Sequence, residues 1–465
     1  MNLKNIIQYF IYTYLYLVCF QRIWASDPFN RLRHNQKQFI ASINNKFDGL
    51  YSPTLFSVYP AMDSTINISS NTIVLINNNI PNVKTGILLN GMLGDFSFFI
   101  EPIIANKIYG LTDLGTEYSR QNISGRIENA FIRYHRNNFT FSFGRSSVWW
   151  GQSISRSIIL SGLYPSFEHL LFRYRFGKIF FDLLCGQLGS RKTETGYRIK
   201  RNIGGHRLIW KIDDKISFSI GEQVIYTGLN RNIELIYLNP FVPYFFTGLE
   251  GDEEDYMYDN DNSIIFADFR YMIKPNLSAY SEIIIDDYQI DDTKIDDALG
   301  LKIGFDGNFR LMKNDLHWVF EWTKIDPWTY IHHGQYTTWE HKGHPIGFSY
   351  GADSECIQLK LVGTFNNYNL ICDFNYLNKG KNNLDTKWDN SSNSNNNGLD
   401  EKYLFTKVGV SVKNKFGRIE TGWVSKDYIN SIIINQIPYN QYGMFYIELI
   451  LEFHKRYNLN YIQKI

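Results

Sequence analysis

The chain has 465 residues, of which 16% are aromatic, with 32 Tyr and 34 Phe. Its 47 basic and 46 acidic residues nearly cancel and form no basic block, so a nucleic-acid partner is not expected. The mean hydropathy is -0.28, and no run beyond the amino terminus approaches the ~18 apolar residues of a membrane helix. The lack of such runs does not exclude a transmembrane barrel, because the strands of a barrel carry apolar residues only at alternate positions.

The amino terminus has the features of an export signal. Met1–Lys4 is short and basic, Ile6–Phe20 is apolar, and Ile23-Trp24-Ala25 precedes Ser26 at a tolerable cleavage site. We therefore expect a signal peptide over residues 1–25, with a retained anchor as the alternative.

The next stretch has apolar residues at roughly helical spacing among polar ones. They are Phe29, Leu32, Phe39, Ile40 and Ile43. Beyond about Pro81, strand patterns dominate, and no Pro- or Gly-rich linker interrupts them. We expect a periplasmic segment with short helices over residues 26–80 and one outer-membrane β-barrel over residues 81–465.

Several strands show two distinct faces. In LHWVFEWTK, residues 316–324, bulky apolar residues alternate with a second set that includes a carboxylate. The apolar set is Leu316, Trp318, Phe320 and Trp322, and the other set is His317, Val319, Glu321 and Thr323. Residues 445–453 show the same alternation. An apolar face opposite one that tolerates carboxylates fits lipid outside and water inside. The rival is a soluble β-protein whose apolar face is a core. The carboxylates predicted to face the lumen are Asp182, Glu282, Glu321, Asp373, Glu448 and Glu452.

Three cysteines follow the signal peptide, an odd number that argues against a disulfide framework. A hairpin turn at Asn366-Asn367 would put Cys356 and Cys372 on opposite faces of the sheet. These two cysteines are therefore not expected to pair.

The sequence lacks several motifs that are typical of enzymes and of metal sites. The chain has no phosphate-binding loop, dinucleotide fingerprint or GxSxG elbow. The histidines of His332–His344 lack the companion Glu of a zincin helix. We expect no metal, no cofactor and no enzymatic activity, although some outer-membrane barrels are lipases.

The stretch Phe139–Leu184 begins as an alternating strand and then changes character. The run GRSSVWWGQSISRSIILSGLYP, residues 144–165, resembles the signature of the capsule-assembly Wzi family. Segments at residues 236–241, 279–289 and 321–355 agree with that family in order. Where the family commonly has Pro-Gly after Trp-Trp-Gly, this chain has Gln152-Ser153.

The resemblance implies an all-β fold: a transmembrane antiparallel β-barrel of about 18 strands with a small N-terminal helical periplasmic element, in the bacterial outer membrane. It also implies a role in binding surface polysaccharide. Aromatic rings stack on sugar C–H faces and arginines bond hydroxyls. The candidate ligand-binding residues are Arg145, Trp149, Trp150 and Arg156. The alternative places both tryptophans in an interfacial aromatic belt and pairs Arg145 with a lumen carboxylate.

The predicted function is a non-enzymatic outer-membrane protein that binds or organises exported capsular or other surface polysaccharide. Its expected partners are outer-membrane lipid and that polysaccharide. The alternatives are a porin-like diffusion channel, whose pore the lumen carboxylates would line, and a lipolytic enzyme.

Overall fold

The computed structural model describes residues 65–77, 80–106, 119–120, 123–247, 260–287, 298–311, 314–331, 336–365, 368–386, 401–414, 417–424 and 444–458. The predicted signal peptide and the predicted short helices at Phe29–Ile43 lie outside these residues. The first described strand begins at Thr65. The barrel therefore starts earlier than the predicted boundary at residue 81.

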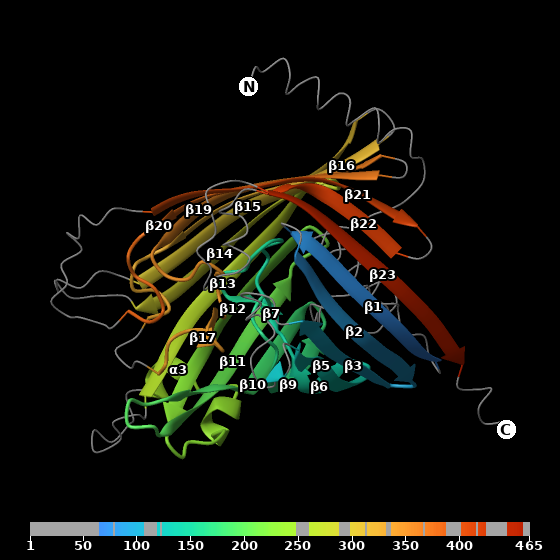
Figure 1. The fold of residues 1–465 in the computed structure, drawn as a ribbon. Helices are drawn as coiled ribbons and strands as arrows, with labels where there is room; N and C mark the ends of the chain where they lie inside the picture. The colour runs from blue at the N-terminus through green and yellow to red at the C-terminus, as the bar shows by residue number, and fades with distance from the viewer. Residues whose placement is uncertain are drawn as a thin grey trace, which may run out of the picture.

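One antiparallel sheet forms the wall (Figure 1), and its 19 strands follow the chain order. They are β1 (Thr65–Asn77), β2 (Ile80–Leu93), β3 (Phe96–Asn106), β4 (Ser119–Arg120), β5 (Ile123–Arg136), β6 (Phe139–Ser146), β9 (Phe167–Phe176), β10 (Ile179–Lys192), β11 (Arg198–Lys211), β12 (Ile216–Gly228), β13 (Asn260–Lys274), β14 (Leu277–Asp287), β15 (Ala298–Leu311), β16 (Asn314–Ile325), β19 (Ser354–Phe365), β20 (Tyr368–Lys379), β21 (Glu401–Asn414), β22 (Gly417–Val424) and β23 (Met444–Asn458).

The sheet closes on itself. β4 has only two residues and pairs with β5 alone. Setting it aside leaves 18 strands in the part of the chain that the structure describes, and β23 pairs along its length with β1 to complete the ring. The predicted all-β, antiparallel barrel of about 18 strands is confirmed.

Alternation along the strands places mostly apolar side chains on the outer face, whereas the inner face carries most buried charged side chains together with apolar ones. On β19, Ile357 and Leu359 are 42% and 38% exposed, while Gln358 and Lys360 between them are each 5% exposed. On β16, Val319, Glu321 and Thr323 are buried as the period-two pattern predicts. The apolar side chains face outward and are accessible, which suits a lipid environment and not a soluble core.

The two ends of the barrel differ. At one end, strands join through tight turns in which Gly94, Asn137 and Gly177 have φ of 57°, 54° and 59°. β1 begins and β23 ends at this end. At the other end the connections include residues 147–166 and 326–353. Outer-membrane barrels keep short turns on the periplasmic side, so the long connections belong to the cell surface.

Two long connections turn into the barrel and carry small hairpins. These are β7 (Trp149–Trp150) with β8 (Leu160–Ser161), and β17 (Glu340–His341) with β18 (His344–Pro345). The main hydrophobic core joins them to inward-facing wall residues such as Leu184, Ile203 and Ile264. The core thus lies inside the barrel. A third connection contains the short helices η2 (Leu235–Leu238) and α3 (Tyr244–Thr247).

No helix among the described residues is long and apolar enough to cross a membrane. Phe365 pairs with Tyr368 across the hairpin turn, as predicted. Cys356 on β19 is buried on the inward face, whereas Cys372 on β20 is half-buried on the outward face, and both are free thiols.

Candidate functional site

The first inserted segment, residues 147–166, leaves the wall at the end of β6 and crosses the interior. Trp150 is 1% exposed and packs 5.8 Å from the ring of Phe266 on β13. The guanidinium of Arg207 on β11 lies 4.7 Å from the centroid of the Trp150 ring. Gly205 makes room for this ring, because a Cβ there would lie 3.0 Å from it.

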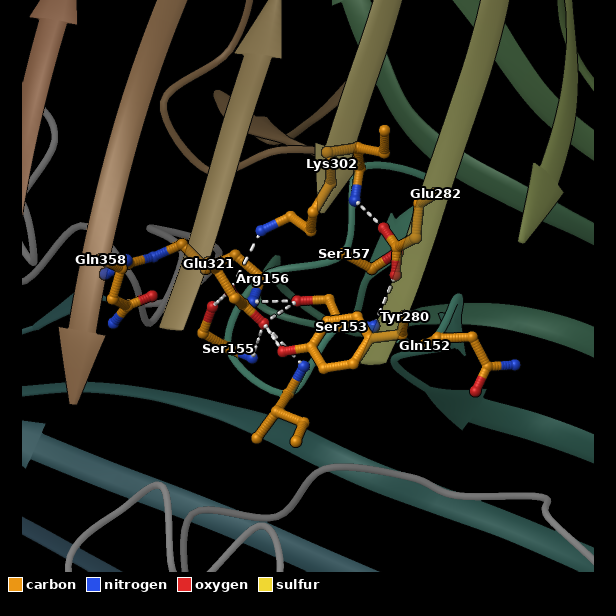
Figure 2. Close-up of polar contacts among 12 residues, drawn as sticks. Gln152, Ser153, Ser155, Arg156, Ser157, Tyr280, Glu282, Lys302, Glu321 and Gln358 are labelled. Atoms are coloured by element: carbon orange, nitrogen blue, oxygen red, sulfur yellow. Dashed lines mark hydrogen bonds and ion pairs between the residues drawn. The ribbon is translucent and has the colours of Figure 1, made fainter. Parts of the chain in front are cut away.

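Two buried carboxylates on the opposite wall bind the backbone of this segment (Figure 2). Glu282 on β14 accepts hydrogen bonds from Ser153 N at 2.6 Å and Ile158 N at 2.8 Å. Glu321 on β16 accepts from Ile154 N at 2.9 Å. These amide donors satisfy buried carboxyl oxygens that would otherwise lose their hydrogen bonds to water. The two carboxylates therefore hold the segment across the barrel.

Side chains add to the contacts of Glu321. The hydroxyls of Ser153, at 2.8 Å, and of Ser155 donate to it. Tyr280 Oη donates from 2.6 Å and Lys302 Nζ from 3.1 Å. Because Glu321 and Lys302 are each only 1% exposed, they form a buried ion pair beneath the segment.

The turn after the tryptophans depends on glycine. Gly151 has φ of 116°, and a Cβ there would collide with Ser157 Oγ and the Glu282 carboxylate. The next side chain, Gln152, donates from Nε2 to Asp268 Oδ1 at 2.7 Å. Gln152 and Ser153 thus make side-chain contacts that a Pro-Gly pair at these positions could not supply.

The second inserted segment is described over residues 326–331 and 336–353, and Arg201 on β11 holds it. Arg201 is fully buried and donates to the carbonyls of Tyr336 at 2.7 Å and Thr338 at 2.5 Å. It also forms an ion pair of 2.6 Å with Glu340. Arg191 reaches the same carboxylate at 2.9 Å.

Ionisable groups of this segment carry shifted pKa values. Burial alone would raise the pKa of Glu340, but Arg201 and Arg191 hold it below its usual value. Burial lowers the pKa of His341 to about 3, and its ring accepts from Gly189 N at 2.9 Å. His341 is therefore neutral at physiological pH.

The two segments also bind each other. Ser161 N donates to Ile346 O at 3.0 Å, and Tyr330 Oη donates to Ile158 O at 2.5 Å. Contacts run from β11 through the second segment to the first segment and on to β14 and β16. The segments therefore form a plug across the interior, which we call the double plug.

The four candidate ligand-binding residues differ from one another in burial and in position. Trp150 lies inside the double plug and is not accessible as a sugar platform. Trp149 is half-buried in the same hairpin. Arg156 donates to Asn375 Oδ1 at 3.2 Å and lies 4.9 Å from the Tyr350 ring. Neither tryptophan belongs to an aromatic belt on the outer wall.

Arg145 is separate from these three residues. It alternates with the inward-facing Ser142 and Ser146 of β6 and lies on the outer face. Its partner is Glu168, with Nε 2.7 Å from Oε1, and that carboxylate is 59% exposed. The alternative pairing with a lumen carboxylate does not occur.

The predicted lumen carboxylates are placed as follows. Asp182 is fully buried between Arg173, at 2.6 Å, and Arg207, at 2.9 Å. Asp373 is 5% exposed and accepts from Gln358 Nε2 at 3.1 Å. Glu282 and Glu321 hold the first segment. The side chains of Glu448 and Glu452 lie outside the described part, although both residues belong to β23.

Sequence reasoning missed Arg201, Glu340 and Lys302. Arg201 shares its strand face with Ile203, so alternation places it inward, but its partners come from a segment that leaves the wall. Glu340 lies in the histidine-containing stretch 332–344, which was assessed from the sequence only as a possible metal site. Among the described residues, no three His, Cys, Asp or Glu side chains gather to hold a metal ion.

An 18-stranded antiparallel barrel with an apolar outer face and a charged, filled interior is a transmembrane barrel of the bacterial outer membrane. The family model described as capsule assembly protein Wzi matches residues 77–420. The chain belongs to this family.

Several solved structures are similar to this chain. One is the Escherichia coli outer-membrane protein Wzi, which is described as a carbohydrate-binding β-barrel involved in group 1 capsule assembly. It is 13% identical to this chain with a TM-score of 0.58, and the match covers 83% of this chain and 84% of that one. Acinetobacter baumannii OccAB4 is 8% identical with a TM-score of 0.45, over 85% and 99%. Pseudomonas aeruginosa OpdK with vanillate is 8% identical with a TM-score of 0.46, over 84% and 98%. No curated protein sequence matches.

Proposed function

We propose that this protein is a non-enzymatic outer-membrane component of capsule assembly that binds or organises exported surface polysaccharide. Family membership supports this role, as does the carbohydrate-binding activity of the Escherichia coli relative. The observation that carries the proposal is the double plug, because a diffusion channel needs an open lumen. Here two segments cross the interior and are held by Glu282, Glu321 and Arg201.

The accessible groups of the first segment are suited to sugar. Trp149 is half-buried, and Arg156 is half-buried at the contact between both segments and β20. An aromatic face and a guanidinium together bind the C–H face and the hydroxyls of a pyranose.

The test measures binding and conductance on the same refolded protein. A glycan array of bacterial surface polysaccharides should show binding, and planar bilayers should show no steady conductance. Trp149→Ala should reduce glycan binding, whereas Glu194→Gln, an exposed change in the β10–β11 turn, should not. A steady open pore without glycan binding would favour the diffusion channel, and hydrolysis of a chromogenic ester would favour a lipolytic enzyme.

A further inference from the structure

The connection between β12 and β13 folds back over the outside of the barrel. Val224 and Tyr226 alternate with the inward-facing Ile225, so they lie on the outer face of β12, yet both are fully buried. Tyr237 of η2 stacks on Tyr226 with ring centroids 4.2 Å apart. Residues 229–247 therefore cover the wall, and we call them the outer cover.

The wall is shaped to receive this cover. Tyr244 of α3 packs 4.5 Å from the ring of His206 on the outer face of β11. Gly204 lies on the same face, and a Cβ there would lie 3.2 Å from Tyr237. Lys200 Nζ donates to Asn232 at 2.7 Å. Figure 1 shows α3 next to β11 and β12.

The cover shields polar groups at a depth where lipid is expected. His206 and Glu222 face each other across β11 and β12, and Glu222 lies halfway along the 13 residues of its strand. A spanning strand needs about 9–11 residues, so this level falls within the hydrocarbon layer. Ionisable groups facing lipid there are destabilising. The cover shields them, and Tyr244 N donates to Glu222 at 2.6 Å.

The far side of the cover is apolar. Leu235, Phe241 and Phe245 are 82%, 90% and 58% exposed. The wall residues Leu208 and Ile220 beside the cover are 50% and 48% exposed and belong to the lipid-facing surface. The apolar outer face thus continues from the wall onto the cover.

Charged groups of the cover are paired on its inner side. Arg231 forms ion pairs with Asp261 of β13 and with Glu234, the latter at 2.7 Å. It also donates to Tyr237 Oη at 3.2 Å. The charges of Arg231 and Glu234 are thus neutralised against the wall, as is usual for ionisable groups at membrane depth.

We propose that the outer cover lies within the outer leaflet of the membrane and presents Leu235, Phe241 and Phe245 to lipid acyl chains. It acts as an intramembrane layer over β10–β13 that keeps His206 and Glu222 out of lipid. The apolar lipid-facing surface of the wall continues onto the cover, so we expect acyl chains, and not a second copy of the chain, to contact it.

Site-directed spin labelling tests this placement. The full mature chain with Cys372→Ser keeps only the buried thiols Cys185 and Cys356, so the folded protein would carry its label at Leu235→Cys or Phe241→Cys. It would be placed in phosphatidylcholine–phosphatidylglycerol vesicles. Collision rates with oxygen, which partitions into lipid, are compared with those of a water-soluble nickel chelate. Ile220→Cys is the control for lipid and Glu194→Cys the control for water.

We expect both cover positions to match Ile220 and to exceed the oxygen-to-nickel ratio of Glu194 several-fold. A ratio equal to that of Glu194 would overturn the proposal, because the cover would then face water. Dipolar broadening with loss of both collision rates would also overturn it, because a second copy would then occupy the surface. Heat-modifiable migration on gels confirms that each labelled barrel is folded.

Discussion

Replacing Glu321 with alanine should open the double plug while leaving the barrel closed. The change removes the acceptor for Ser153, Ile154 and Tyr280 and leaves Lys302 buried without its 3.1 Å partner. Removing one member of a buried ion pair costs about 3–5 kcal/mol. The population with a released first segment should therefore rise by roughly two to four orders of magnitude.

Trypsin reports this release, because Arg156 lies within the first segment. Cleavage after Arg156 should be far faster in Glu321→Ala than in the wild type or in Glu194→Gln, and planar bilayers should show openings only in Glu321→Ala. Adding Lys302→Met should recover part of the protection, because it removes the orphaned cation. A folded Glu321→Ala barrel that resists trypsin and stays silent would refute the proposed role of Glu321.

Three further outcomes follow from the plug. Gly151→Ala should lower plug stability by about 1–3 kcal/mol in the trypsin assay, whereas Gly177→Ala, with positive φ but open space around it, should cost less. Trp150→Ala should cost about 3–5 kcal/mol, but Trp149→Ala should leave trypsin resistance unchanged. Since burial lowers the pKa of His341 to about 3 from 6.5, the folded plug binds this proton more weakly than the released one. Plug stability should fall by up to about 1.4 kcal/mol per pH unit below 6.5, and His341→Gln should flatten this dependence.

The wall was predictable because its chemistry repeats every second residue. Glu321 lies on the same face as Val319, and the hairpin at residues 366–367 fixed the opposite faces of Cys356 and Cys372. The start of the barrel was harder to locate. The inner face of β1 carries small polar residues such as Asn67, so the segment gives a weak apolar signal and was assigned to the periplasmic region.

The plug and the cover were not predictable from local pattern. Trp150 stands in a stretch whose composition fits a surface loop or a belt, and its burial depends on residues more than fifty positions away, such as Arg207. The carboxylate at Glu282 was predicted to face the lumen, but nothing local indicates that it binds backbone amides of another segment. The burial of Trp150 and the hydrogen bonds of Glu282 both depend on residues far away in the sequence. The local residue pattern does not show which distant residues come into contact.

The pairing of β1 with β23 has a consequence for biogenesis. Leu75 and Glu448 are neighbours in the sheet although almost the whole chain separates them, so the ring cannot close until the last strand has arrived. Until then the edges of β1 and β22 both stay unpaired, and such edges are templates for aggregation. Pairing of β23 with β1 removes both edges at once and thereby completes the barrel.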